Sequence, residues 1–70
     1  MKLLFSARLK ELMKSFDLNQ VQLEQKTGLK QNTISQWLNN VNEPSITSLW
    51  ILADFFDVEV DYLIGRKDYS

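Results

Sequence analysis

Side-chain amides are concentrated in one part of this chain. All ten asparagine and glutamine residues lie between Asn19 and Asn42, and the stretch from Gln31 to Asn42 contains no charged residue. A primary amide presents a hydrogen-bond donor and an acceptor side by side, which matches the N6 amine and the N7 atom of adenine in the DNA major groove. The pattern predicts a surface that reads the edges of bases.

These amides share one face of an expected helix over residues 31–38. At roughly 100° per residue, the polar and apolar side chains of this segment fall in opposite arcs. The polar arc carries Gln31, Asn32, Ser35, Gln36 and Asn39. A face that is only solvated usually carries Lys and Glu, because long charged side chains form helices better than asparagine does. We therefore expect that base recognition accounts for this face, and a functionless amide-rich surface is the simpler alternative.

Composition narrows the class of protein. The chain has 70 residues, no cysteine and no histidine, so it has neither a thiolate metal site nor the commonest catalytic base. No nucleophile and base stand in a recognisable arrangement, so we expect no enzymatic activity, no cofactor and no small-molecule substrate. The apolar runs are too short to span a membrane and the N-terminus lacks a secretory segment, so a soluble, cytoplasmic protein is expected.

The charge is distributed unevenly. The net charge is −1, but residues 1–40 hold six basic and three acidic side chains, for a net charge of +3. Residues 41–70 hold two basic and six acidic side chains, for a net charge of −4. This asymmetry is compatible with one half approaching phosphate groups while the other half faces elsewhere.

The hydrophobic spacing predicts an all-α chain of five short helices. Apolar residues recur at intervals of three and four in the first and fourth segments. Asn19 and Ser45 are good N-caps, while Gly28 and Gly65 are good helix terminators. Within a single domain of residues 1–70, we expect helices at about 4–16, 20–27, 31–38, 45–56 and 60–64.

Two aspartates stand where a helix would normally end in glycine. Asp17 follows the first expected helix and Asp57 follows the fourth. Aspartate is one of the few residues other than glycine that tolerates a positive φ angle. We expect both to adopt this left-handed conformation.

Several short motifs together resemble a known family. They are Gln20-x-x-Leu23, Gly28-Leu29, Thr33-Ile34-Ser35-x-Trp37, Pro44-Ser45 and Asp61-Tyr62-Leu63-x-Gly65. Over residues 8–65 the chain resembles the helix-turn-helix domains of the Cro and phage-repressor family, the XRE-like group. The resemblance implies a compact lambda-repressor-like bundle of about five helices with its helix-turn-helix at about 20–38. It also implies that helix 31–38 enters the major groove while helix 20–27 crosses the DNA backbone.

The resemblance implies roles for individual residues. Gln20 would touch a phosphate and brace the first base-reading residue. The positions that meet base edges are Gln31, Asn32 and Gln36, with Ser35 as a lesser candidate. The positions that contact the DNA backbone are Asn19, Gln20, Lys30, Asn39, Asn40 and Asn42.

Three departures from the family pattern carry predictions. Glu24 replaces the usual alanine where the two central helices pass closely, so its side chain either extends to solvent or widens the crossing. An Arg–Glu pair that is common in the family is replaced by Met13 and Leu38, which we expect to be in contact. The loop over residues 40–43 lacks the usual Lys and Arg, so we expect a shallow dependence of DNA affinity on salt.

The aromatic residues have more than one interpretation. Trp37 and Trp50 would suit stacking on single-stranded bases, but their apolar neighbours favour packing in the core or in an interface. The phenylalanines are expected in the core, namely Phe5, Phe16, Phe55 and Phe56.

Alternating acids also have two interpretations. Asp57, Glu59 and Asp61 have the spacing of a calcium-loop opening, but Tyr62 occupies the position where that loop needs glycine. Acidic side chains favoured by the dipole at the start of the last helix are the better explanation, so we expect no metal site.

Two function classes remain open. The first is a sequence-specific regulator of transcription that represses by binding double-stranded DNA, as a homodimer on the two half-sites of a palindromic operator. The resemblance places the dimer contact near 57–64, and the candidates are Trp50, Ile51, Val60 and Tyr62. The second class is an antitoxin or phage-type regulator that acts mainly through protein–protein interaction, which the acidic C-terminal half favours.

Overall fold

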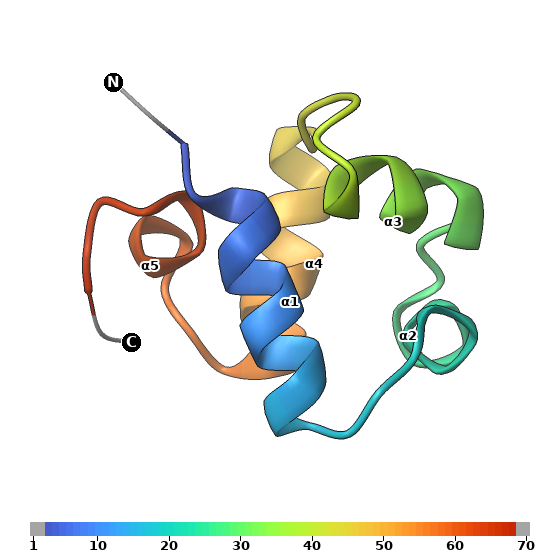
Figure 1. Ribbon diagram of the computed structural model, residues 1–70. Helices are drawn as coiled ribbons and strands as arrows, with labels where there is room; N and C mark the ends of the chain where they lie inside the picture. Colours follow the sequence, from blue (N-terminus) through green and yellow to red (C-terminus); the bar gives the residue numbers. More distant parts are fainter. Residues whose placement is uncertain (1–2, 69–70) are drawn as a thin grey trace.

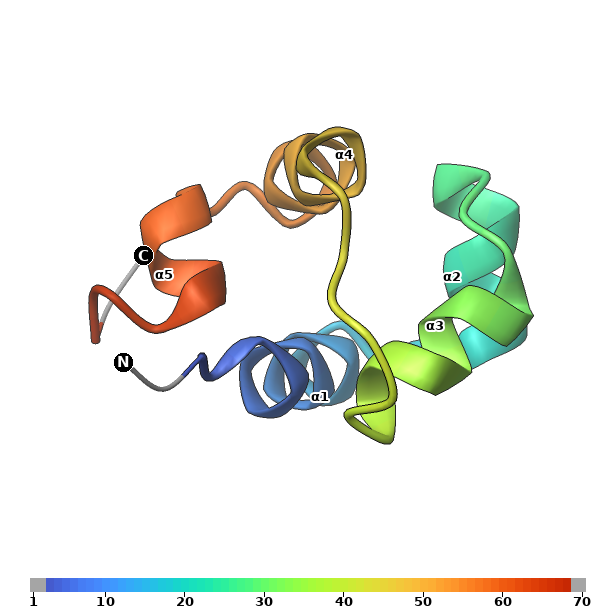
Figure 2. The same ribbon diagram turned by 90° about the horizontal axis from the view of Figure 1, so that it is seen from above.

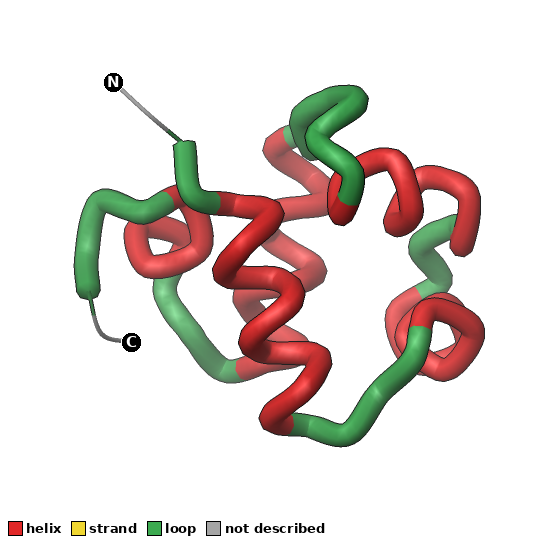
Figure 3. The backbone as a smooth tube through the Cα atoms, viewed as in Figure 1, coloured by secondary structure: helices red, strands yellow, loops and turns green. Residues whose placement is uncertain are grey.

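The fold consists of five α-helices joined by short loops (Figures 1 and 3). The computed structural model describes residues 3–68. The helices are α1 (Phe5–Ser15), α2 (Gln20–Thr27), α3 (Gln31–Leu38), α4 (Ile46–Phe56) and α5 (Val60–Ile64). Their bounds lie within one residue of those expected from the sequence, so the all-α expectation is confirmed. None of the described helices is both long and apolar enough to cross a bilayer.

The helices surround a single core. In two perpendicular views α1 and α4 occupy the middle of the molecule, α5 lies at one end, and α2 and α3 lie at the other (Figures 1 and 2). Helix α5 packs against both α1 and α4, whereas α3 contacts α1 and α2 contacts α4. Each helix contributes one fully buried aliphatic residue, and these are Leu9, Leu23, Ile34, Leu52 and Leu63. The helix-turn-helix is thus anchored to the core by residues of both its helices.

The expected capping residues define the helix ends. The Asn19 side chain accepts a hydrogen bond from the Gln22 amide (2.8 Å), and the Gln22 side chain accepts one from the Asn19 amide (2.9 Å). This reciprocal capping box satisfies two amides that have no partner inside helix α2. Ser45 similarly accepts from the Ser48 amide at 3.1 Å and caps α4.

Both aspartates adopt the expected left-handed conformation. The φ angle is 55° at Asp17 and 57° at Asp57. Glycines end α2 and α5, where the φ angle is 80° at Gly28 and 94° at Gly65. A side chain at position 65 would also collide with Leu4, because a Cβ atom there would lie 2.8 Å from two carbons of that residue.

The aromatic residues divide between core and surface. Trp37 is buried and meets Phe5 edge-on, with ring centroids 5.6 Å apart, so it is no platform for base stacking. Trp50 is 74% exposed, so it is not a core residue and its alternative place in an interface stays a prediction. Core placement is wrong for Phe16, which is 47% exposed. Phe16 lies just past the end of α1, where the chain turns away at Asp17, so only one side of its ring reaches the core.

Phe16 nevertheless has aromatic neighbours on α4. Its ring lies edge-on to Phe56 with centroids 4.9 Å apart, and it is tilted against Phe55 with centroids 6.2 Å apart. Offset and edge-on pairs of this kind are favourable beyond the area they bury. Phe16 therefore packs at the edge of the core, beside the C-terminal end of α4.

Candidate nucleic-acid interface

The turn between α2 and α3 is fixed by local hydrogen bonds. The Thr27 hydroxyl donates to the Leu23 carbonyl at 2.7 Å and accepts from the Leu29 amide at 3.2 Å. The left-handed Gly28 reverses the chain between these two bonds. The relative orientation of the two helices is thus set by backbone geometry and by the buried residues Leu23 and Ile34.

The amide face of α3 is open to solvent. Ile34 and Trp37 hold the opposite face of the helix in the core. Three of the four predicted base-reading residues are exposed, namely Gln31, Asn32 and Gln36. The fourth, Ser35, is half-buried. The structure therefore leaves uncovered the surface that the sequence predicts to read DNA.

The predicted backbone-contacting residues flank α3 on its two sides. Those that precede it are Asn19 and Gln20 at the start of α2, and Lys30, which immediately precedes α3. Those that follow it are in the loop over 39–45. Gln20 is half-buried, and the others are exposed, namely Asn19, Lys30, Asn39, Asn40 and Asn42. Among the described residues no hydrogen bond joins Gln20 to Gln31, so that brace stays a prediction.

Two of the loop amides are bonded to α3 itself, which the sequence did not reveal. The Asn39 Nδ2 atom donates to the Ser35 carbonyl at 2.9 Å. The Asn42 Nδ2 atom donates to Gln36 Oε1 at 2.8 Å. Of these two residues, which the resemblance assigns to the phosphate backbone, Asn42 thus also bonds a base-reading side chain, whereas Asn39 bonds the backbone of Ser35. The only signal in the sequence was the density of amides in this loop.

Glu24 lies beside the first turn of α3. It is half-buried and lines an open hollow of about 430 Å³ with Lys30, Gln31, Asn32 and Thr33. Within residues 3–68 its carboxylate forms no ion pair. The two predicted outcomes, a side chain that extends to solvent and a widened helix crossing, both stay predictions. A carboxylate nevertheless stands beside two of the predicted base readers.

The end of α3 is tied to α1. The Ser6 hydroxyl donates to the Leu38 carbonyl at 2.9 Å. Met13 is buried, and Leu38 is half-buried against the same cluster of core side chains. A direct contact between Met13 and Leu38 stays a prediction, but neither position carries a charge that needs a partner.

Four acidic side chains of the C-terminal half lie away from the amide face, whereas Glu43 lies in the loop that follows α3. Asp54, Asp57, Glu59 and Asp61 are exposed at the end of α4 and around the start of α5. Figure 2 shows α5 and α3 at opposite ends of the molecule. Glu59 pairs with Lys67 at 2.6 Å, and the hydrogen bond and charge of Glu59 raise the pKa of Lys67 above its ordinary value. Most of the negative charge of the C-terminal half is therefore separated in space from the amide face.

The predicted dimer residues do not share one face. Trp50 is 74% exposed and Val60 is 36% exposed, while Ile51 and Tyr62 are half-buried. Consecutive residues of a helix point about 100° apart, so Trp50 and Ile51 face different directions. The Tyr62 ring lies under the Arg8 guanidinium, 4.6 Å from its centroid, and so faces α1. Trp50 and Val60 are the better exposed pair.

Comparison with known proteins agrees with this geometry. A helix-turn-helix family model matches residues 9–63. The chain is 32% identical over 65 residues to the uncharacterized HTH-type transcriptional regulator YobD of Bacillus subtilis (strain 168), covering 93% of this chain and 58% of that protein. A solved structure described as a transcriptional regulator from Listeria innocua superimposes with a TM-score of 0.84 at 25% identity, covering 93% of this chain and 61% of that one.

The chain thus spans about three-fifths of the length of the relatives that it matches. The family match covers most of the described residues, including all of α2, the turn and α3. The five-helix arrangement is likewise shared with the Listeria protein. This chain belongs to the helix-turn-helix family, of the Cro and phage-repressor type.

Proposed function

We propose that this chain is a sequence-specific, double-stranded DNA-binding domain of a transcriptional regulator. The observation that carries the proposal is the uncharged face of α3, where Gln31, Asn32 and Gln36 are all exposed on a helix anchored by its opposite face. Amides on such a helix can pair with base edges in the major groove, and each good bidentate pair contributes about 1–3 kcal/mol of discrimination. The names of both relatives, which describe regulators, support the proposal.

We further propose that the domain acts as a repressor on a palindromic operator. One recognition helix makes too few base contacts for strong specificity, so two copies would bind half-sites about one helical turn apart. The exposed pair Trp50 and Val60 supports self-association near the α4–α5 junction. Such a protein acts inside the cell, and its family is non-enzymatic.

Selection of duplexes from a random library tests the proposal. The native domain should enrich a palindrome, and Gln31→Ala and Gln36→Ala should each relax the preference at one position of the half-site. Trp50→Ala should weaken self-association in sedimentation while the fold is retained. Failure of the native domain to enrich any sequence at low salt, where phosphate attraction is greatest, would contradict DNA recognition.

One observation favours a second function, docking of another protein. Ile46 is 86% exposed and Trp50, one helical turn along α4, is 74% exposed. Exposed apolar side chains in a row are typical of interaction surfaces. If the selection enriches no DNA, the antitoxin-like or phage-type regulator becomes the better account, with this row on α4 as its contact surface.

A further inference from the structure

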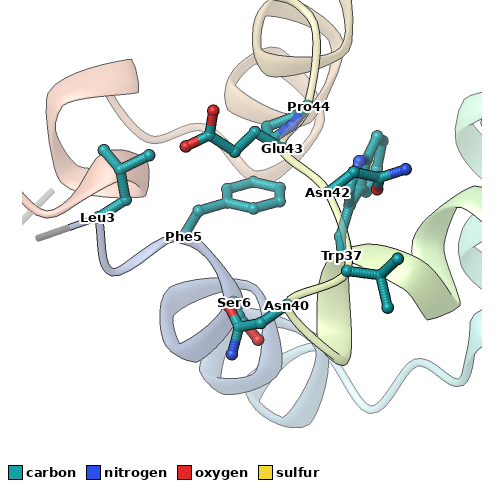
Figure 4. A pocket seen from close by; sticks show the side chains of 9 residues that line it. Leu3, Phe5, Ser6, Trp37, Asn40, Asn42, Glu43 and Pro44 are labelled. Carbon is teal, nitrogen blue, oxygen red and sulfur yellow. The ribbon is translucent and has the colours of Figure 1, made fainter.

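The loop after α3 folds back onto the helix that it leaves. The Val41 amide donates to the Gln36 carbonyl at 2.8 Å, and the Asn40 amide donates to the Trp37 carbonyl at 3.1 Å. Asn40 reverses the chain with a φ angle of 59°. This backbone arrangement brings Asn42 beside Gln36. Figure 4 shows Asn42, Glu43 and Pro44 on this loop, along the pocket that Phe5 and Trp37 also line.

The hydrogen bond between these two residues has a direction. Asn42 Nδ2 donates to Gln36 Oε1 at 2.8 Å, so the oxygen end of the Gln36 amide is held toward the loop. The nitrogen end of a primary amide lies on the other side of its carbon, so it points away from Asn42. Because Gln36 is exposed on the amide face, its two free N–H groups are presented to solvent.

This direction matters for base recognition. In the major groove guanine and thymine present a carbonyl oxygen, O6 or O4, where adenine and cytosine present an amine, N6 or N4. A glutamine that offers N–H groups suits the carbonyl, and a glutamine that offers its oxygen suits the amine. A free glutamine offers either end by rotating its amide.

We propose that Asn42 is a positioning residue that holds the NH₂ end of Gln36 toward DNA, so that Gln36 selects guanine or thymine over adenine or cytosine. The inference rests on the proposed function. It also gives Asn42 a second role, because one of its two amide N–H groups is used on Gln36 and the other stays available to a phosphate. Asn40, in the same loop, has no side-chain hydrogen bond within the described residues and stays available for the backbone.

The test is duplex selection at one salt concentration with the native domain, Asn42→Asp, Asn42→Ala and Asn40→Asp. The base position read by residue 36 is identified as the one whose preference Gln36→Ala removes. The native domain should prefer guanine or thymine there, and a native preference for adenine or cytosine would overturn the proposal, because it would mean that the Gln36 amide is held in the opposite sense. Aspartate only accepts hydrogen bonds, so in Asn42→Asp the Gln36 amide turns its NH₂ toward the loop and its oxygen toward DNA. The preference should then shift toward adenine or cytosine by roughly three- to tenfold.

The two other variants separate positioning from charge. Asn42→Ala frees the amide, so both classes of base should be accepted. Asn40→Asp adds the same negative charge to the same loop, at a left-handed position that aspartate tolerates. It should weaken binding to all sequences and leave the preference unchanged. Equal thermal midpoints for Asn42→Asp and Asn40→Asp would show that the shift does not arise from unfolding.

A second readout needs no DNA. In NMR spectra of the free domain, Asn42→Asp should move the side-chain NH₂ signals of Gln36, and Asn40→Asp should leave them in place. An unchanged preference at that base in Asn42→Asp, or unmoved Gln36 signals, would overturn the role of Asn42. If the native domain enriches no duplex, the proposed function fails, and the NMR signals still decide whether Asn42 orients Gln36.

Discussion

The two ends of the molecule present opposite chemistry to solvent. At the α2–α3 end, an uncharged face of amides lies on a helix whose other face is buried. At the α4–α5 end, four carboxylates are exposed, and two of them, Asp54 and Asp57, line a hollow with the exposed Trp50. The net charge of −1 hides this division. An acidic composition therefore does not argue against DNA binding when most of the acids, apart from Glu24 and Glu43, lie far from the reading surface.

The largest expected effect is the loss of stability when the buried side chain behind the amide face is shortened. Ile34 is fully buried behind it, whereas Ile46 on α4 is 86% exposed. Ile34→Ala should lower the free energy of unfolding by about 2–5 kcal/mol, because it removes buried methyl groups and leaves a cavity. Ile46→Ala should change it by less than about 0.5 kcal/mol. Urea unfolding measures both, and equal losses would contradict the assignment of buried and exposed faces.

The next largest expected effect is the loss of DNA affinity when a predicted base-reading residue is replaced. Gln31→Ala should weaken binding to the selected duplex by about 1–3 kcal/mol, because a paired base edge loses its partner. Gln25→Ala removes an exposed amide from α2, outside the amide face, and serves as the control. Fluorescence anisotropy with the selected duplex and with a scrambled one compares them. A loss that is the same for both duplexes would show that Gln31 contacts only the backbone.

A smaller effect separates phosphate attraction from base reading. Lys30 is the exposed basic residue that immediately precedes α3, and the loop over 39–45 carries no Lys or Arg. Lys30→Gln should weaken binding to all sequences alike and reduce the slope of log affinity against log salt by about 1. Affinities measured over a series of salt concentrations give this slope. A steep slope that Lys30→Gln does not change would place the phosphate contacts elsewhere.

The smallest expected effect is a change in stability at the α4–α5 end of the molecule, where Glu59 pairs with Lys67. The Glu59 hydrogen bond and charge raise the pKa of Lys67, which means that folding favours the charged lysine. This contribution is fully present below the ordinary pKa of 10.5 and is lost as the pH rises through the raised value. Glu59→Gln should therefore be slightly less stable than the native domain at pH 7, and the difference should shrink at strongly alkaline pH. Urea unfolding of both proteins at pH 7 and at strongly alkaline pH measures this difference in stability. A difference that does not depend on pH would contradict the pairing of Glu59 with Lys67.

Much of the fold was predictable because local chemistry sets it. Asn19 and Ser45 cap the helices that they were expected to cap, and Asp17 and Asp57 adopt the left-handed turns that glycine usually provides. The exposure of the amide face follows from the burial of Ile34 on the other side of α3. In each case the sequence within a few residues contains the physical cause.

The remaining features depend on how loops place side chains in space. The spacing of Phe16 fits the buried stripe of α1, but the turn at Asp17 leaves its ring half outside the core. The bond from Asn42 to Gln36 requires the reversal at Asn40, which no periodic pattern encodes. Side chains at helix ends and in loops are therefore where sequence interpretation was wrong or incomplete.

The most direct test of DNA reading by the amide face is an NMR titration of the domain with its selected duplex. The side-chain amide signals of Gln31, Asn32 and Gln36 should shift and saturate together, because these groups would leave water for base edges. The Gln25 amide on α2 provides an internal reference that should change little. If the duplex binds while the three α3 amide signals stay unmoved, the account of this face as the DNA-reading surface is contradicted.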